Sequence, residues 1–458
     1  MVMLRKTRRI HFVGIGGSGM SGIAEVLINL GYTVSGSDLE EGAVVRRLRG
    51  LGGTVHRGHR AENVGDADVV VVSSAVVASN VEVQEARRRQ IPVIPRAEML
   101  AELMRIKYGI AIAGSHGKTT TTSMVAQVLS GAGLDPTIVI GGRLGILDSN
   151  AKLGRGDLLV AEADESDGSF LRLTPTIAVV TNIDAEHLDH YGRLEALVEA
   201  FAGFLNKVPF YGVGIVCLDD DRVRGILPRL TRRVVRYGFA PQADLSATAI
   251  EIREFHAAFD VVLQRRVLGR VALKVPGRHN IANALAAIAV GLDLEVPFDV
   301  IARELQDFHG ADRRFQLKGE AGGVMVIDDY GHHPSEILAT LAAAKVGWNR
   351  RTVVVFQPHR YSRVRALLDE FAGAFGGADV LAVTGIYPAG EAPIEGVTAG
   401  AVARALKTRG HPDVTLVEDL DAVAGWLRSR VKEGDMVITL GAGSVYRAGE
   451  AFLRLLQG

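Results

Sequence analysis

The sequence predicts an α/β protein of about three domains. The chain has 458 residues, and domains hold roughly 150 residues each, so its length favours about three. Many of its 53 glycines directly follow short β-branched runs, as where a strand ends in a tight loop before a helix. Two of these loops are rich in glycine, which indicates ligands that carry phosphate.

The composition is that of an ordinary globular protein, with 48% hydrophobic and 23% charged residues. Lys+Arg and Asp+Glu both number 52, so the net charge is zero. The protein as a whole therefore has no field that would attract nucleic acid or an anionic membrane, and we expect neither as a partner. An anionic ligand must be held by a local site.

The single cysteine and the N-terminus indicate a cytoplasmic protein. Cys217 has no second cysteine to pair with, which suits a reducing compartment, and we interpret it as a small core residue. Basic residues at 5–9 precede an apolar stretch, but this stretch ends at Gly14, too early for a signal peptide. No run approaches the roughly 18–20 apolar residues of a membrane span.

The first block opens with an expected strand at 10–13, followed by a glycine loop and a helical stretch at about 19–30. A second strand is expected at 33–36. Residues 68–73 have the composition of a strand that is buried on both faces. A helix that ends near Arg105 closes the block.

The second block is expected to contain four short strands, at 109–113, 158–161, 177–181 and 213–218. Apolar and polar residues alternate from 245 to 273, as in an antiparallel edge or excursion of a sheet. An alanine-rich helix is expected at 281–291.

The third block begins near Phe315, and helical stretches separate its strands. The strands are expected at 324–327, 352–356, 380–384 and 436–440. The expected domains are thus residues 1–107, 108–314 and 315–458.

The most specific motif is Gly114–Thr120, GSHGKTT, between an expected strand and helix. Backbone amides at a helix N-terminus form a phosphate cradle, in which Lys118 would reach the β- and γ-phosphates and Thr119 would bind Mg²⁺. The loop is one residue shorter than the standard motif, because Ile112 stands where the first glycine is expected. The alternative is a chance Gly-Lys-Thr at a helix start, which the strand–loop–helix context disfavours.

Magnesium at such a loop usually takes one or two carboxylates. Glu162, just past a strand in AEADESD, is the natural candidate, with Glu165 and Asp164 as rivals. A solvated acidic loop is the alternative. His187 also follows a buried strand, although a lone histidine is more often structural and His190 is a nearby competitor.

The first glycine loop, 14–19, fits G-x-G-x-x-G, with Asp38 near the end of the second strand. Alone it indicates a dinucleotide fold with an acid for the ribose. It is weak evidence for NAD, because such a loop can hold any diphosphate. An NAD-dependent dehydrogenase would also leave Gly114–Thr120 without a role.

Two polar motifs follow consecutive strands of the third block, at 328–334 and 357–363. Arg360 and Arg363 lie three residues apart and can grip a carboxylate as a fork. A basic surface loop explains this spacing equally well.

Taken together, these stretches resemble the Mur ligases from end to end. The matching segments are 14–25, 114–122, 161–170, 181–191, 277–287, 312–315, 328–336 and 357–363. They fall in all three blocks, in the order found in that family.

The resemblance implies a Rossmann-like UDP-sugar domain, a central P-loop ATPase domain with a mostly parallel sheet, and a C-terminal Rossmann-like domain. The last would bind the amino acid and complete the nucleotide site. Within the family the motifs are most similar to the branch that uses ATP and one or two Mg²⁺ ions to join L-alanine to UDP-N-acetylmuramate. The alternative is the recycling branch, which adds a tripeptide to the same nucleotide sugar. We expect a monomer or weak homodimer.

The resemblance also implies roles for individual residues. The UDP-sugar site would comprise Gly14, Gly16, Gly17, Ser18, Gly19, Met20, Asp38 and Ser73. The ATP site would comprise Gly114, Ser115, His116, Gly117, Lys118, Thr119, Thr120, Asn280, Asn283, Arg314 and Asp329. The magnesium ligands would be Thr119, Glu162 and His187, and the amino-acid site would comprise His332, Arg360 and Arg363. The catalytic set would be Lys118, Glu162, His187, Arg314 and His332.

One departure concerns a carbamylated lysine that several sister ligases carry a short distance beyond the His187 position. Residues 200–205 occupy that region here, and the nearest lysine is Lys207. The alanine-adding branch does without this group, so its absence agrees with the resemblance.

Overall fold

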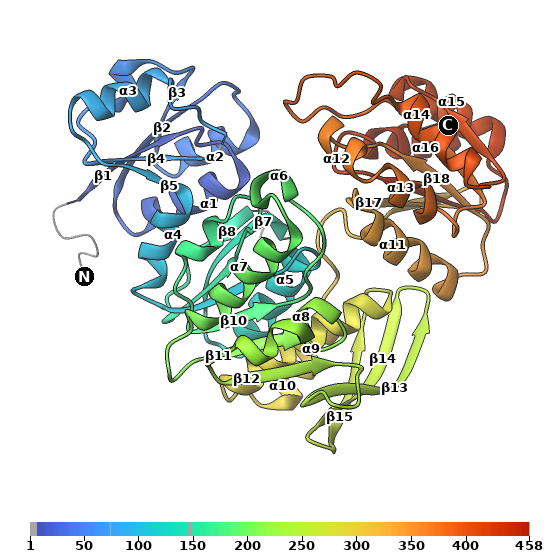
Figure 1. Cartoon of the computed structure of the whole chain (residues 1–458), viewed down its shortest axis with the longest axis horizontal. Coiled ribbons are helices and arrows are strands. Elements are labelled where there is room, and N and C mark those ends of the chain that lie inside the picture. Colours follow the sequence, from blue (N-terminus) through green and yellow to red (C-terminus); the bar gives the residue numbers. More distant parts are fainter. Residues whose placement is uncertain (1–6, 74, 145–148, 458) are drawn as a thin grey trace. The chain divides into compact units, whose positions relative to one another are not determined.

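A computed structural model describes residues 7–73, 75–144 and 149–457 (Figure 1). The chain divides into two compact units. Unit one comprises Met1–Ala249, Phe259–Val271 and Ala282–Phe308, and unit two comprises Ile250–Ala258, Ala272–Ile281 and His309–Gly458.

Unit one begins with a five-stranded parallel sheet in the order β3-β2-β1-β4-β5. Its strands are β1 Arg9–Val13, β2 Thr33–Asp38, β3 Thr54–Arg57, β4 Val69–Val72 and β5 Val93–Pro95. Its helices are α1 Ser18–Asn29, α2 Ala43–Gly50, η1 Ala61–Val64, α3 Val81–Arg88 and α4 Arg96–Met104. The strand order reverses at β1, so the loops after β1, β2 and β4 meet at one edge, where α/β proteins bind ligands.

The central sheet has ten strands in the order β15-β14-β13-β12-β11-β10-β6-β9-β7-β8. The strands from β12 to β7 in this order pair in parallel, whereas β8 pairs antiparallel to β7. The strands are β6 Tyr108–Ala113, β7 Thr137–Leu144, β8 Ser149–Lys152, β9 Leu158–Glu162, β10 Ile177–Val180, β11 Val213–Cys217, β12 Val234–Gly238, β13 Leu245–Arg253, β14 His256–Leu263 and β15 Arg266–Leu273. The helices are α5 Lys118–Gly131, η2 Ser169–Arg172, α6 Leu188–Tyr191, α7 Leu194–Asn206, α8 Asp221–Ile226, η3 Leu227–Arg229, α9 Arg278–Asp293 and α10 Phe298–Gln306.

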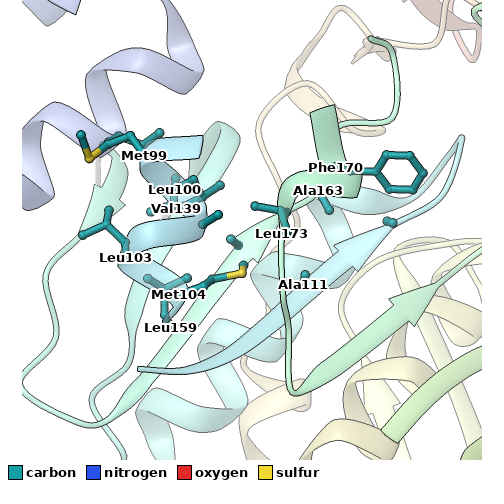
Figure 2. Close-up of a cluster of buried hydrophobic side chains, with 14 of the residues drawn as sticks. Met99, Leu100, Leu103, Met104, Ala111, Val139, Leu159, Ala163, Phe170 and Leu173 are labelled. Atoms are coloured by element: carbon teal, nitrogen blue, oxygen red, sulfur yellow. The ribbon is translucent and has the colours of Figure 1, made fainter. Parts of the chain in front are cut away.

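One hydrophobic core joins α4 to the central sheet (Figure 2). Leu103 and Met104 of α4 belong to the same buried cluster as Ala111 of β6 and Leu159 of β9. Burial of such side chains stabilises the contact by roughly 1.5–3 kcal/mol per large residue. This core therefore fixes the first sheet against the second within unit one.

Unit two contains a six-stranded sheet in the order β16-β17-β21-β18-β19-β20. Among the described strands of this sheet, β16 pairs antiparallel with β17 and the other neighbours pair in parallel. The strands are β16 Gln316–Ala321, β17 Val324–Asp329, β18 Thr352–Phe356, β19 Val380–Val383, β20 Val414–Leu416 and β21 Met436–Leu440. The helices are α11 Pro334–Gly347, α12 Tyr361–Ala366, α13 Leu368–Ala374, α14 Ala399–Thr408, η4 Leu420–Ala422, α15 Val423–Arg430 and α16 Tyr446–Gln457.

The predicted α/β class with three sheets is confirmed. Strands occur at every predicted position, and the alternating segment 245–273 forms β13, β14 and β15 at one edge of the central sheet. Among the described residues, no helix has both the length and the apolar character needed to cross a bilayer.

Candidate active site

The first glycine loop wraps around the end of β2. The amides of Gly14 and Ile15 donate to Ser37 O at 2.8 and 3.0 Å. The Gly16 amide donates to Asp38 Oδ2 at 2.8 Å, and a Cβ on Gly16 would crowd that carboxylate. Asp38 thus shapes the loop itself, and its predicted contact with a ribose stays a prediction.

A cavity of about 220 Å³ connects this loop with the central sheet. From the first sheet it is lined by Gly17, Gly19, Met20, Ser73 and Arg96, and from the second by Glu162 and Asp164 among others. The structure therefore brings four of the eight predicted UDP-sugar residues to one cavity, namely Gly17, Gly19, Met20 and Ser73. Glu162, a predicted magnesium ligand, also lines this cavity.

Arg96 was not predicted from the sequence. It is the first residue of α4 and its Nη2 lies 3.2 Å from Asp164 Oδ2. The guanidinium packs so closely on Gly19 that a Cβ there would overlap it. Arg96 is therefore a cation between the glycine loop and the carboxylates, well placed for a diphosphate or carboxylate.

The second glycine loop lies between β6 and α5. Lys118 Nζ donates to Gly114 O at 2.6 Å, to Ser115 O at 3.0 Å and to Glu165 Oε1 at 2.8 Å. Gly114 has a φ of +135°, and a Cβ there would overlap the Thr181 hydroxyl. Glycine is thus required where the loop leaves β6.

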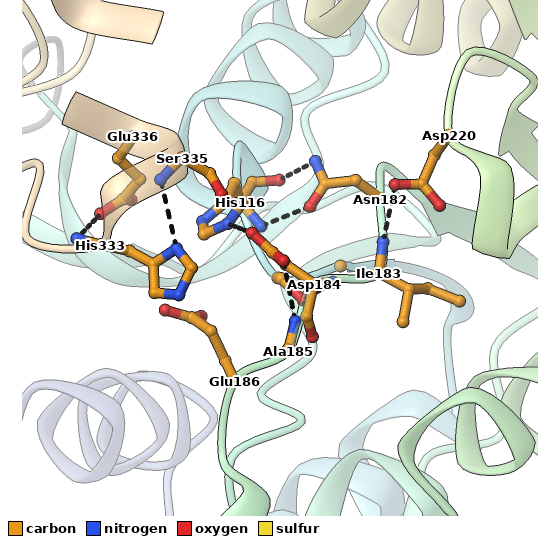
Figure 3. A network of polar contacts seen from close by, with 12 residues as sticks. His116, Asn182, Ile183, Asp184, Ala185, Glu186, Asp220, His333, Ser335 and Glu336 are labelled. Atoms are coloured by element: carbon orange, nitrogen blue, oxygen red, sulfur yellow. Dashed lines mark hydrogen bonds and ion pairs between the residues drawn. The ribbon is translucent and has the colours of Figure 1, made fainter. Parts of the chain in front are cut away.

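The loop is also held by the segment that follows β10 (Figure 3). Asn182 Oδ1 accepts from the His116 amide at 2.8 Å, and Asn182 Nδ2 donates to His116 O at 3.0 Å. His116 Nε2 lies 2.9 Å from Asp184 Oδ2, and the Ser115 hydroxyl accepts from the Asp184 amide at 2.8 Å. These contacts hold the phosphate cradle in shape, a role that the sequence did not reveal.

Carboxylates and an imidazole gather beside the loop. The Thr119 hydroxyl donates to Glu162 Oε2 at 3.0 Å. His187 Nε2 lies 3.7 Å from Glu165 Oε1 and 3.8 Å from Glu186 Oε2. Ligand atoms of Glu165, Glu186 and His187 all lie within 4.8 Å of one another. Glu162 and Glu165, which the sequence left as rival magnesium ligands, thus contact different residues of the loop: Glu162 contacts Thr119, and Glu165 contacts Lys118.

This donor set fits a divalent cation. Mg²⁺ takes oxygen ligands such as hydroxyls and carboxylates, and histidine is a common further ligand of divalent metals. Glu165 is fully buried, and its Oε2 has no hydrogen-bond partner among the described residues. A buried carboxylate oxygen of this kind is costly unless a cation or donor satisfies it.

Lys118 and Glu165 form a coupled buried pair. Burial alone lowers the pKa of Lys118, but the nearby carboxylates of Glu165 and Glu162 outweigh it, so the net shift is upward. Lys118 therefore stays charged at neutral pH. Burial raises the pKa of Glu165, and the Lys118 charge opposes that rise.

The two asparagines predicted near the adenine lie one turn apart on α9. Asn283 Oδ1 accepts from the Thr121 hydroxyl at 3.2 Å, next to the loop in unit one. Asn280 Nδ2 donates to Pro276 O at 2.7 Å. Thr120, the last predicted loop residue, is buried in the first turn of α5.

In unit two, Asp329 ends β17 and accepts from the amides of Phe315 and Gly331, both at 2.7 Å. Burial raises the pKa of Asp329 to about 6, although the Arg314 charge opposes the shift. Arg314 Nη1 lies 3.1 Å from Glu336 Oε1. Arg314 and Asp329 therefore lie close together at the carboxyl end of β17.

The start of α11 fixes the predicted His332. Glu336 Oε2 accepts from the amides of His332 and His333 at 3.0 and 3.2 Å, and His333 Nδ1 accepts from the Ser335 amide (Figure 3). His332 Nδ1 lies 3.0 Å from Tyr330 O, which indicates that this nitrogen carries the proton.

The predicted arginines lie after β18, and His359 joins them. Arg363 Nη1 donates to His359 Nδ1 at 3.1 Å. The His332 and His359 rings are 5.5 Å apart, and His359 stacks on Tyr387 with ring centroids at 5.5 Å. Burial, His332 and both arginines lower the pKa of His359 to about 3, so His359 is neutral and can accept that bond. His359 and Tyr387 were not predicted as site residues.

The fold and these sites define an α/β enzyme that uses a nucleoside triphosphate. The second glycine loop forms a strand–loop–helix phosphate cradle with a buried lysine next to carboxylates, and the first glycine loop opens on an adjoining cavity. The chain belongs to the Mur ligase family, as the sequence resemblance predicted. Residues 9–108 match the model "Mur ligase family, catalytic domain", residues 112–291 the middle domain, and residues 313–443 the "glutamate ligase domain".

Named relatives match over almost the whole chain. The UDP-N-acetylmuramate–L-alanine ligase of Syntrophotalea carbinolica is 60% identical over 99% of both chains. The ligase of the same name from Geotalea daltonii is 59% identical over 99% of both chains. Among solved structures, the UDP-N-acetylmuramate–alanine ligase of Thermotoga maritima has a TM-score of 0.82 and 30% identity, and covers 98% of this chain and 99% of its own.

Proposed function

We propose that the protein joins L-alanine to the lactyl carboxylate of UDP-N-acetylmuramate, giving UDP-N-acetylmuramoyl-L-alanine, ADP and phosphate. This product is a precursor of peptidoglycan. The proposal rests on the 60% identity over 99% of both chains to a relative that bears this activity in its name. The tripeptide-adding alternative is not favoured, because the curated relatives at 56–60% identity carry the L-alanine name.

The reaction must first activate a carboxylate, because a carboxylate does not react with an amine at neutral pH. Mur ligases are ATP-dependent, and we assign the loop Gly114–Thr120 to ATP. Lys118 would neutralise the β- and γ-phosphates as the γ-phosphoryl group passes to the lactyl oxygen. In such transfers positioning and charge stabilisation supply most of the catalysis.

We assign a magnesium ion to Thr119, Glu162 and His187. When bound, Mg²⁺ supplies positive charge that stabilises the phosphoryl oxygens. The proposal is supported by the Thr119 hydroxyl and Glu162 Oε2, which lie 3.0 Å apart beside the loop, and by His187, whose Nε2 lies 3.7 Å from Oε1 of the buried Glu165.

The alanine amine then attacks the acyl phosphate, and the tetrahedral intermediate expels phosphate. We assign the alanine carboxylate to Arg360 and Arg363, whose guanidinium groups can hold it as a fork. His332 is our candidate for the base that accepts the amine proton. Arg314 would contact a phosphate and Asp329 the ribose, with Asn280 and Asn283 near the adenine.

In this proposal residues 1–107 bind the UDP-sugar, residues 108–314 bind ATP, and residues 315–458 bind the amino acid and contribute to the nucleotide site. The substrates are small molecules. ATP and UDP-sugars are cytoplasmic metabolites, so we place the enzyme in the cytoplasm.

The test is phosphate release from ATP and Mg²⁺ with UDP-N-acetylmuramate, with and without L-alanine. We expect release that requires both substrates and is lost in Lys118→Ala. Lys345→Ala is the matched control, because Lys345 is a half-exposed lysine paired with Asp379 on the surface of unit two. Release with a tripeptide but not with alanine would favour the recycling activity, and no release with either acceptor would overturn the proposal.

A further inference from the structure

The Lys118 ammonium already uses all three of its N–H donors. Its partners are Gly114 O at 2.6 Å, Ser115 O at 3.0 Å and Glu165 Oε1 at 2.8 Å. A lysine has three donors and no acceptor. A phosphate oxygen can therefore bind Lys118 only if one of these three bonds is given up.

Glu165 is the partner that can be exchanged. Gly114 O and Ser115 O belong to the loop backbone, whose shape the segment after β10 fixes. Glu165 instead bonds to Lys118 through its side chain, and it lies 47 positions further along the chain. Its carboxylate and an incoming phosphate are both anions, so they compete for the same ammonium.

The other carboxylates beside the loop have different partners. Glu162 accepts from the Thr119 hydroxyl at 3.0 Å. Asp164 pairs with Arg96 at 3.2 Å and accepts from the Ser166 amide at 3.0 Å. Glu165 is thus the carboxylate that bonds directly to Lys118 among the described residues.

A divalent cation would change this competition. Glu165 Oε1 lies 3.7 Å from His187 Nε2, and Glu165, Glu186 and His187 present their ligand atoms within 4.8 Å of one another. A cation bound between these three side chains would compensate the negative charge of Glu165 once the Lys118 ammonium has left Glu165 to bind a phosphate. The pair is buried, with side chains 15% and 1% exposed, so solvent screens these interactions weakly.

We propose that Glu165 makes the phosphate loop select a nucleotide that arrives with a divalent cation, by competing with phosphate for Lys118 when no cation is present. The inference rests on the proposed function only in that the ligand of the loop is ATP or ADP. It assigns Glu165 a positioning and selectivity role, and leaves the transfer itself to the residues named above.

The test is the affinity for ADP, measured by calorimetry once with EDTA and once with Mg²⁺. We expect Glu165→Gln to bind metal-free ADP roughly tenfold more tightly than the wild type, which is the effect of about one charge-assisted hydrogen bond. Affinity for ADP with Mg²⁺ should change less, so the preference for the metal complex falls. Glu199→Gln is the matched control, because Glu199 is an exposed carboxylate that pairs with Arg229 in the same unit.

A double-mutant cycle with Lys118→Ala shows whether the gain depends on the lysine. The gain should vanish in the double variant, because no ammonium is left to release. Glu165→Asp, which has a shorter side chain, should also bind metal-free ADP more tightly than the wild type. It replaces Glu165→Gln in the test if that variant does not fold. A gain in affinity cannot come from structural damage.

Unchanged or weaker binding of metal-free ADP in both Glu165 variants would overturn this inference and leave the ligase proposal intact. A wild-type chain that binds no ADP under either condition would overturn both.

Discussion

The carboxylate of Glu391 holds both the backbone and the side chain of Ser362. It accepts from the Ser362 hydroxyl at 2.6 Å and from the Ser362 amide at 3.0 Å. Ser362 lies between the two arginines assigned to the amino-acid carboxylate. Arg360 has a φ of +66°, a conformation that costs on the order of 1 kcal/mol or more and persists only where its surroundings hold it.

Loss of Glu391 should therefore weaken amino-acid binding more than turnover. We expect Glu391→Ala to raise the KM for L-alanine by roughly tenfold with a smaller effect on kcat, since two hydrogen bonds to charged oxygens are lost. Glu391→Gln should restore part of the affinity. Glu395→Gln, at an exposed position of the same loop, is the control, and an equal fall of kcat in Glu391→Ala would contradict a positioning role.

The Thr119 hydroxyl should act as a magnesium ligand during the reaction. We expect Thr119→Val to lower kcat by roughly a hundredfold and to raise the Mg²⁺ concentration needed for half-maximal rate, because one oxygen ligand is removed. Thr122→Val is the matched control one turn further along α5, where the hydroxyl bonds only to Lys118 O among the described contacts. If kcat fell equally in both variants, the loss would come from a disturbed helix α5 and not from a missing magnesium ligand.

The fold could be predicted where each strand carries its own signal. Runs such as β18 Thr352–Phe356 are entirely buried, and their composition shows this directly. No comparable signal marks β5 or β20, which are three residues long, or β16 Gln316–Ala321, which has no buried residue. Strands of this kind form because a neighbouring strand supplies the hydrogen bonds, which local sequence does not encode.

The candidate sites could be predicted where their residues are contiguous. The loop Gly114–Thr120 was predicted from its spacing and its strand–loop–helix context, whereas the role of arginines 360 and 363 was implied by the family resemblance. Arg96 reaches Asp164 across 68 positions, and Glu391 reaches Ser362 across 29. Such contacts depend on which strand ends meet at the edge of a sheet, so only the structure reveals them.

Arg96 should contribute to binding of the UDP-sugar. It lines the cavity next to Gly19 and Ser73, and a guanidinium binds phosphate or carboxylate through charge-assisted hydrogen bonds. We expect Arg96→Ala to raise the KM for UDP-N-acetylmuramate by roughly tenfold or more and to leave the KM for L-alanine within about twofold. Arg172→Ala, which removes a more exposed arginine paired with Glu98, is the control. A rise in the KM for alanine alone would contradict this role.

Glu82 should make the N-terminal sheet sensitive to acid. The side chain is fully buried and accepts from the Ser37 hydroxyl and from Asn63 Nδ2, both at 2.6 Å. Burial by itself would raise the pKa of Glu82, but the nearby His11 ring and the hydrogen bonds from Ser37 and Asn63 outweigh it and lower the pKa from 4.5 to about 2.

A carboxylate whose pKa is lower in the folded than in the unfolded chain stabilises the fold above the unfolded pKa. This contribution, about 3 kcal/mol for a shift of this size, is lost as the pH falls from about 4.5 to about 2. The difference in unfolding free energy between the wild type and Glu82→Gln should therefore be largest at pH 7 and shrink between pH 5 and pH 3. Hydrogen exchange of amides in β1 and β2 would measure it, with Glu62→Gln, at an exposed position of η1, as the control. A difference that stays constant with pH would show that Glu82 stabilises the sheet through its shape and not through its charge.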